Sequence, residues 1–254
     1  MKTWMKSLAM VALLALGAAA CEDGTTDANS FDDAGLIADA ALVAADGMFQ
    51  DLAHMQSPGT WGGAAAATAP EGIEIQGSTN FTRTVTFFPE NSYDPITTTH
   101  MEIVSDLTRQ VTHTFWSADI IRHREMTVSG LEGDETQRTW DGTATGDVSK
   151  SRHPEGSVIR TYDMESTAVI SQVVRALPRV DNPWPLSGTI TRTIHVLRTA
   201  EGEDPVERNI TTTITFNSTQ NVFMYVDDGS GPVEYAIDLS EKNVKRRFQR
   251  KNKK

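Results

Sequence analysis

Cysteine is nearly absent: Cys21 is the one thiol among 254 residues. One thiol cannot form an intramolecular disulfide, and it cannot supply a zinc site or a redox pair of thiolates. Long apolar runs are also missing. The longest, Leu8 to Leu16, has nine residues, whereas a membrane-spanning helix takes about 20. The chain must therefore be stabilised by an ordinary core rather than by disulfides or by membrane-spanning helices.

The common catalytic motifs are absent as well. The sequence contains no H-E-x-x-H, G-x-S-x-G, P-loop or G-x-G-x-x-G segment. His100 and Glu102 share one predicted strand face, and His113 and His123 lie on nearby predicted strands, but their spacing is not diagnostic of a metal site. We therefore predict no catalytic residue, no metal and no cofactor. Whether the protein is an enzyme stays open, and a non-catalytic role is favoured.

Positive charge is scarce outside the two ends of the chain. The formal net charge of −11 becomes −13 when Lys2 and Lys6 are left out. The last ten residues, 245–254, hold seven more positive charges, so residues 21–244 carry −20. An acidic body disfavours general binding to nucleic acid. We expect no nucleic-acid partner.

The N-terminus has the order of a secretory signal peptide. Lys2 and Lys6 precede the apolar run, and the small residues Gly17 to Ala20 follow it, directly before Cys21. Ala18 and Ala20 would also satisfy an ordinary A-x-A cleavage site. Cleavage at this site cuts the bond between Ala20 and Cys21. We therefore expect the residues from Cys21 onward to fold outside the cytoplasm.

The residues that end at Cys21 resemble the lipobox of bacterial lipoproteins, although Ala18 stands where that family prefers leucine. The resemblance implies that Cys21 becomes the mature N-terminus and carries acyl chains, each contributing about 0.8 kcal/mol per buried methylene to membrane binding. It implies a lipid-anchored place in the cell envelope. Glu22 differs from the aspartate associated with inner-membrane retention, which favours the outer membrane. The alternative is ordinary cleavage that leaves Cys21 as a free thiol.

Composition divides the chain into six segments. The stretch "CEDGTTDANSFDD", residues 21–33, has five acidic and no basic side chains, which is typical of a solvated tether. Glycine, proline and small residues follow the one helical pattern and predict a linker. The predicted segments are a signal peptide (1–20), an acidic tether (21–31), an amphipathic helix (32–55), a linker (56–72), an antiparallel β domain (73–244) and a basic tail (245–254).

Residues 32–55 form the only strong helical pattern. Asp32 and Asp33 suit the positive N-terminal end of a helix, and the alanines and leucines favour its interior. A spacing of 100° per residue places apolar and polar side chains on opposite sides. On the apolar side we expect Ile37, Met48, Leu52 and Met55 to pack against a sheet. The polar side holds Asp39, Asp46, Gln50 and His54.

From residue 73 onward the hydrophobic period changes to two and threonine becomes abundant. In "NITTTITFN", residues 209–217, apolar and polar side chains alternate, which indicates a sheet with one dry and one wet face. About ten such segments, among them "ITTTHMEIV", are separated by turn clusters with no helical pattern between them. We therefore predict a mainly β fold: an antiparallel meander of about ten strands in a curved barrel or half-barrel, with the N-terminal helix packed on it.

Three functions fit these features. The first is a non-catalytic envelope lipoprotein, held to the membrane by its N-terminal lipid, whose β domain binds an apolar ligand or an envelope protein. The second is a surface-anchored carbohydrate-binding module or hydrolase, with sugars stacked on aromatic side chains. The candidate aromatic residues are Trp61, Trp116, Trp140, Trp184 and Tyr162. The third is a purely structural envelope component, which a filled sheet interior would indicate. The sequence fixes neither the ligand nor the oligomeric state.

Overall fold

The computed structural model describes residues 33–55, 78–114, 116–152, 159–179, 181–241 and 243–246. The predicted signal peptide, Cys21 and the acidic tether lie outside these residues, as do the linker and most of the basic tail. Elements follow in the order α1 (Asp33–His54), β1 (Thr79–Phe88), β2 (His100–His113), β3 (Trp116–Ser129), β4 (Gln137–Arg152), β5 (Arg160–Ala176), β6 (Ser187–Ala200), β7 (Val206–Thr215), β8 (Asn221–Asp227), β9 (Val233–Asp238) and β10 (Asn243–Arg246).

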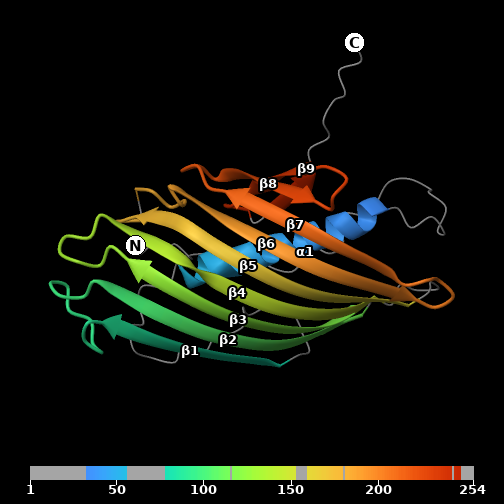
Figure 1. The fold of residues 1–254 in the computed structure, drawn as a ribbon, viewed down its shortest axis with the longest axis horizontal. Coiled ribbons are helices and arrows are strands. Elements are labelled where there is room, and N and C mark those ends of the chain that lie inside the picture. The colour runs from blue at the N-terminus through green and yellow to red at the C-terminus, as the bar shows by residue number, and fades with distance from the viewer. Residues whose placement is uncertain are drawn as a thin grey trace, which may run out of the picture.

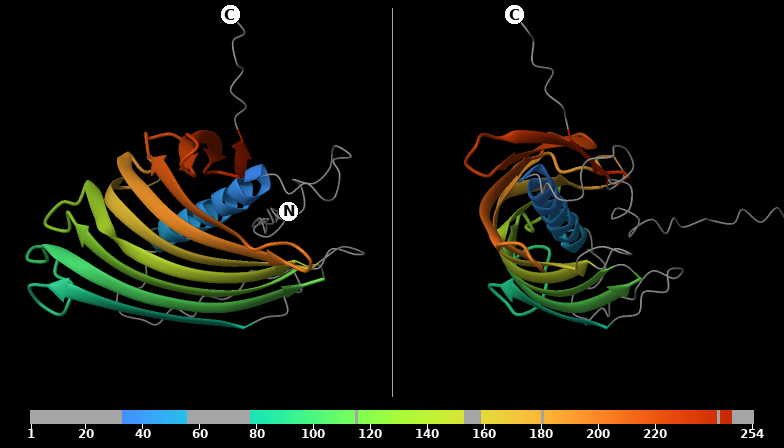
Figure 2. Two further views of the ribbon diagram at one scale, coloured as in Figure 1. Left: turned by 45° about the vertical axis from the view of Figure 1, so that its right-hand side comes forward. Right: turned by 90° about the vertical axis from the view of Figure 1, so that its right-hand side faces the viewer.

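The ten strands form one antiparallel sheet in which every strand pairs with its neighbours in the chain, from β1 to β10. Within the described residues no ladder joins β1 to β10, so the sheet stays open. Figure 1 shows the strands sweeping across α1, and Figure 2 shows the sheet curving around α1 and open on the opposite side. The predicted meander is confirmed, and its form is a half-barrel.

Two neighbouring irregularities help to bend the sheet. The ladder between β4 and β5 shifts register at Asp141, and the ladder between β5 and β6 shifts near Gln172. Gln172 has a positive φ of 50°, and both its backbone N–H and its Nε2 donate to the Asp141 carboxylate at 2.8 Å. Because a bulge bends its strand and increases the twist, this pair turns the middle of the sheet around α1.

The second strand begins later than the sequence pattern predicts. The segment "ITTTHMEIV" starts at residue 96, but β2 begins at His100. Asp94 Oδ1 accepts hydrogen bonds from the backbone N–H groups of Ile96 and Thr97, at 2.7 and 3.3 Å. An aspartate that bonds its own following backbone stabilises a turn, so these residues leave the ladder despite their β-branched side chains.

Helix α1 fills the concave side of the sheet and contributes much of the core. Met48 is fully buried, Leu52 and Met55 are each 5% exposed, and Ile37 is partly buried against the same cluster. Four alanines of α1 are also buried, and their small side chains let the helix axis approach the strands. These are Ala40, Ala41, Ala44 and Ala45. No helix in the described part of the chain has the length and apolar character needed to cross a bilayer.

The residues assigned to the polar side of α1 also contact the sheet. Asp46 and Gln50 accept hydrogen bonds from arginines of β3, and the ring of His54 lies 5.3 Å from that of Phe81 on β1. The side chain of Asp39 is outside the described residues. The half-barrel curves far enough to meet the helix on its polar side as well as its apolar side.

Candidate functional site

Three buried arginines lie on the concave face beneath α1, and we call them the arginine belt: Arg122 and Arg124 of β3 and Arg192 of β6. Their side chains are 5%, 2% and 5% exposed. The strand register places Arg124 in one row with Ala144, Ala168 and Arg192. Because only two methyl side chains separate them, the guanidinium groups have room to lie over β4 and β5.

The belt surrounds a carboxylate that comes from the helix. Asp51 has no exposed surface; Arg124 Nε donates to its Oδ1 at 2.6 Å and Arg192 Nη2 donates to its Oδ2 at 3.1 Å. At its edge, Arg122 Nη2 donates to Asp46 Oδ2 at 2.9 Å, and Arg124 Nη2 donates to Gln50 Oε1 at 3.3 Å. A buried ion pair of this kind holds its partners in one register, because removal of either partner leaves an uncompensated buried charge.

Positive charge exceeds negative charge at this site. Three guanidinium groups face two carboxylates, and Asp46 is half exposed, with 49% of its side chain accessible. The Nη1 atoms of Arg122 and Arg124 are buried and have no hydrogen-bond partner among the described residues. Burial lowers the pKa of Arg192 and the Asp51 carboxylate opposes that shift, yet an arginine stays charged in proteins. The interior therefore has spare capacity to bind anionic oxygen atoms.

Gly47 lets the helix lie directly on the belt. A Cβ added at this position would stand 2.8 Å from Arg192 Cζ and 2.8 Å from its Nη2. Those distances are well inside van der Waals contact, so any larger side chain would displace the guanidinium group or lift the helix. The glycine thus matches α1 to Arg192.

His54 lies at the C-terminal end of α1, beside the belt. Burial, followed by the positive charge of Arg124, lowers the pKa of His54 from 6.5 to about 4, and Asp51 opposes the shift. The imidazole is therefore neutral at pH 7. It adds no charge to a site that already has an excess of cations.

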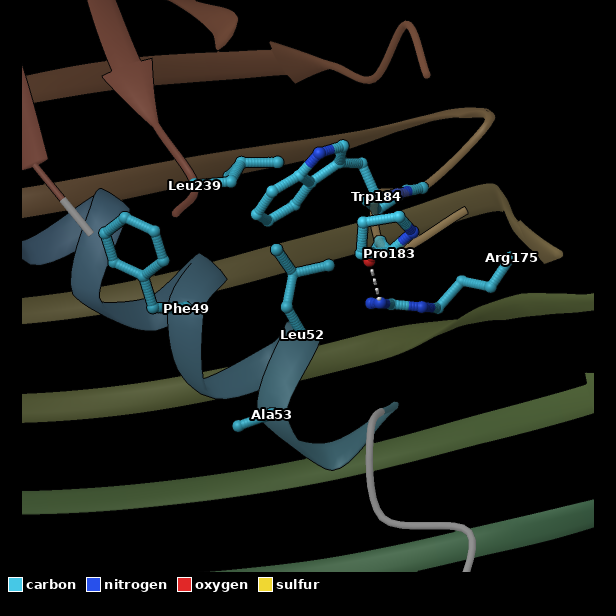
Figure 3. Close-up of a pocket in the computed structure, with 8 residues that line it drawn as sticks. Phe49, Leu52, Ala53, Arg175, Pro183, Trp184 and Leu239 are labelled. Atoms are coloured by element: carbon cyan, nitrogen blue, oxygen red, sulfur yellow. Dashed lines mark hydrogen bonds between the residues drawn. The ribbon is translucent and has the colours of Figure 1, made fainter. Parts of the chain in front are cut away.

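A small pocket lies where the C-terminal half of α1 meets the end of the half-barrel (Figure 3). Phe49 and Leu52 of α1 face Trp184 and Leu239 across it, and its volume is about 40 Å³. Arg175 lines it too: burial lowers the pKa of Arg175 to about 10, and its Nη2 donates to the Pro183 carbonyl at 2.8 Å. The volume holds a few water molecules and is far below the roughly 300 Å³ of a small-molecule site.

The histidines considered as metal ligands are not brought together. His100 stacks on Phe88 with ring centroids 4.6 Å apart, while His123 bonds to Asp106 at 2.7 Å and to Glu125 at 3.2 Å on the convex face. Glu102 is exposed, and the side chain of His113 is outside the described residues. Across the described residues, no group of three or more potential ligand side chains could hold a metal ion.

The aromatic residues considered as a sugar platform are dispersed. Trp140 and Tyr162 are each 3% exposed and belong to the core, and Trp184 packs against that core from the pocket. Trp116 is partly buried at the start of β3, and Trp61 lies outside the described residues. Side chains placed in this way offer no shared exposed face.

Sequence reasoning missed the arginine belt and Asp51, although both left a signal. Arg192 stands between Ile190 and Ile194 in the alternation of its strand, at a position where an inward apolar side chain is expected. Asp51 falls between Met48 and Met55 at helical spacing, on the apolar side of α1. Charged residues on a predicted dry face indicate a buried ion pair or a binding site. Comparisons with protein-family models, curated proteins and solved structures find no match for this chain.

Proposed function

We propose that this protein is a non-catalytic lipoprotein of the bacterial envelope that binds an apolar ligand on the concave face of its half-barrel. One observation carries the proposal: among the described residues, a large apolar face of an unclosed ten-stranded sheet is covered by one helix. The chain on both sides of α1 is long, with residues 22–32 before the helix and 56–77 between it and the sheet. The helix can therefore leave its place without breaking any strand ladder.

The space beneath a displaced helix suits an extended acyl chain. Helix α1 has 22 residues, which corresponds to about 33 Å of length and roughly 10 Å of width. On both sides of the arginine belt the strands present aliphatic side chains toward this space, such as Met126, Ile190, Ile194 and Ile210. Burial of an alkyl chain there would replace the apolar contacts that α1 now makes.

Anchoring at Cys21 is supported by the signal-peptide order and by the lipobox resemblance. Several acyl chains on one terminus hold a protein to a bilayer where a single chain binds only marginally. Intact mass of the membrane-extracted protein tests this, and the expected species begins at acylated Cys21. A mature protein with unmodified Cys21, or a Cys21→Ala variant that still fractionates entirely with outer membranes, would contradict it.

Ligand binding is tested with the secreted full chain carrying Cys21→Ala, which removes the lipid and no described residue. We expect the neutral apolar probe N-phenyl-1-naphthylamine to bind saturably, with about one molecule per chain. Hydrogen exchange should increase in residues 33–54 while the β4 and β5 amides stay protected. Saturable binding without any change in α1 exchange would place the probe elsewhere and contradict the concave site.

A purely structural envelope component is the second candidate. It is favoured by one observation, that α1 packs into the concave side and the pocket beside its C-terminal half has a volume of only about 40 Å³. This role predicts no saturable probe binding and a melting temperature that the probe does not change. The same titration therefore separates the two functions.

A further inference from the structure

We propose that the arginine belt is a binding site for the anionic headgroup of an amphiphile, and that the Asp51 carboxylate of α1 occupies it when no ligand is bound. The inference rests on the proposed function and adds the chemical class of the ligand: an alkyl chain that ends in a carboxylate or phosphate. Asp51 then acts as an internal substitute for the ligand.

The donors at the belt exceed what the helix uses. Asp51 accepts from one nitrogen of Arg124 and one of Arg192, whereas the Nη1 atoms of Arg122 and Arg124 stay unpaired within the described part of the chain although they are buried. Leaving a buried donor unsatisfied is unfavourable. A headgroup with two or three oxygens, not bound to a helix backbone, could bond these donors as well.

The position of the belt fits an amphiphile better than a free anion. Its side chains are nine-tenths or more buried in the middle of an apolar face, so a small anion would enter without burying any apolar surface of its own. An alkyl chain along β6 would contact Ile190 or Ile194, which flank Arg192 on the same face. Charge pairing and apolar burial then stabilise the same complex.

The contact between α1 and the arginine belt also allows a ligand to replace the helix. Asp51 comes from α1, which covers the concave face among the described elements, and Gly47 presents no side chain to Arg192. When the helix leaves, both carboxylates leave with it, and the belt keeps three uncompensated positive charges in the sheet. An anionic ligand can therefore displace the helix where a neutral one of equal length binds less well.

The decisive measurement compares three ligands on the secreted Cys21→Ala chain: oleate, oleyl alcohol and oleoyl lysophosphatidic acid. Dissociation constants follow from displacement of N-phenyl-1-naphthylamine. We expect at least one of the two anionic ligands to bind ten-fold or more tightly than oleyl alcohol, and the tighter one identifies the headgroup. Equal binding of all three would overturn the inference while leaving the proposed function intact. Absence of any binding would overturn both.

Substitutions test whether the preference for an anionic ligand arises at the arginine belt. Arg192→Met should reduce the affinity for the preferred anionic ligand at least ten-fold and leave oleyl alcohol within two-fold, whereas Asp51→Asn should tighten the anionic ligand several-fold. Arg109→Met is the matched control, because Arg109 is a partly buried arginine of β2 outside the belt. A melting scan of each variant verifies that it folds. The comparison of the three ligands on the Cys21→Ala chain does not depend on these variants. An anionic preference that survives Arg192→Met would overturn the assignment to the belt.

Discussion

The two faces of the sheet place polar side chains in different surroundings, and the dry face also contains charges. The convex face, in contact with water, has a row of neutral threonines across β4 to β7, formed by Thr145, Thr167, Thr193 and Thr211. The concave face, removed from water, has the arginine belt and Asp51. Charges are expensive to bury unless they are paired, so their position on the dry face needs a specific reason.

That reason is the placement of α1. An apolar helix on an apolar sheet can slide or rotate at small cost, because aliphatic contacts are non-directional. A buried carboxylate held by guanidinium groups from two strands allows one position only. The convex face meets no other described element, so its exposed charges stay in water, and its threonines favour extended backbone.

Removal of the buried charge should have the largest effect on the free energy of unfolding. Asp51→Asn should lower the free energy of unfolding by about 3–5 kcal/mol, because Arg124 and Arg192 would lose their shared counter-charge. The matched change on the convex face is Asp119→Asn, at an exposed position, with an expected effect below about 0.5 kcal/mol. Urea unfolding measures both. Similar losses for the two variants would mean that the concave charges do not fix α1.

Lower pH should weaken the concave side selectively. The pKa of His54 is about 4 in the folded protein and 6.5 when unperturbed. Between these values the unfolded chain binds more protons, so the free energy of unfolding decreases as pH falls. The expected loss between pH 7.5 and pH 5 is about 2 kcal/mol.

His54→Phe keeps a ring against Phe81 and removes the titrating group. This variant should lose about 2 kcal/mol less than the wild type over the same pH interval, as measured by urea unfolding at each pH. If the two proteins show parallel pH profiles, then His54 does not stay neutral beneath the sheet.

Gly47→Ala tests how closely the helix lies on Arg192. Alanine alone would stabilise a helix by about 1 kcal/mol relative to glycine, but the new methyl group would meet the guanidinium at 2.8 Å. We expect a net loss of about 1–2 kcal/mol. Ala53→Gly is the control at an exposed position of α1. It measures the difference in stability between alanine and glycine in this helix without contact to Arg192. A more stable Gly47→Ala protein would show that α1 has room above the belt.

The smallest test exchanges threonine for valine on each face. Thr212 is 1% exposed on the concave face, and its hydroxyl donates to the Arg192 carbonyl at 3.4 Å, so Thr212→Val should cost about 1 kcal/mol. Thr193 is exposed on the opposite face of the neighbouring strand, and Thr193→Val should change stability by less than about 0.5 kcal/mol. Thermal melting resolves the pair. Equal shifts in melting temperature for the two variants would show that the concave and convex threonines contribute equally to stability.

Local signals account for what the sequence predicts well. The helix predicted at 32–55 is found at Asp33–His54, and the meander of about ten strands is found with ten, because periodicity and turn residues act over short stretches of chain. The arginine belt was not predicted, because it depends on register across four strands. Nothing near Arg124 in the sequence says that Ala144, Ala168 and Arg192 share its row.

The local sequence pattern of α1 also could not predict which of its side chains contact the sheet. Asp46 and Gln50 look like solvent-facing residues while α1 is considered alone, and they become interface residues only because the sheet curves around the helix. Part of that curvature comes from two bulges joined by the bond between Asp141 and Gln172, which are 31 residues apart. Amphipathicity predicts that a helix packs against a sheet, but not how far the sheet wraps around it.

The connectivity of the buried ion pair sets an order of folding. Each strand of the meander joins the one made just before it, so the sheet can grow by short loop closures as the chain emerges. Asp51, in contrast, is 73 residues from Arg124 and 141 residues from Arg192. Helix α1 thus precedes every described strand in the chain, but its ion pairs cannot be completed until β6 has been made. Until β6 emerges, α1 has only part of its binding surface, and a chain interrupted before residue 192 exposes an apolar helix beside an unfinished sheet.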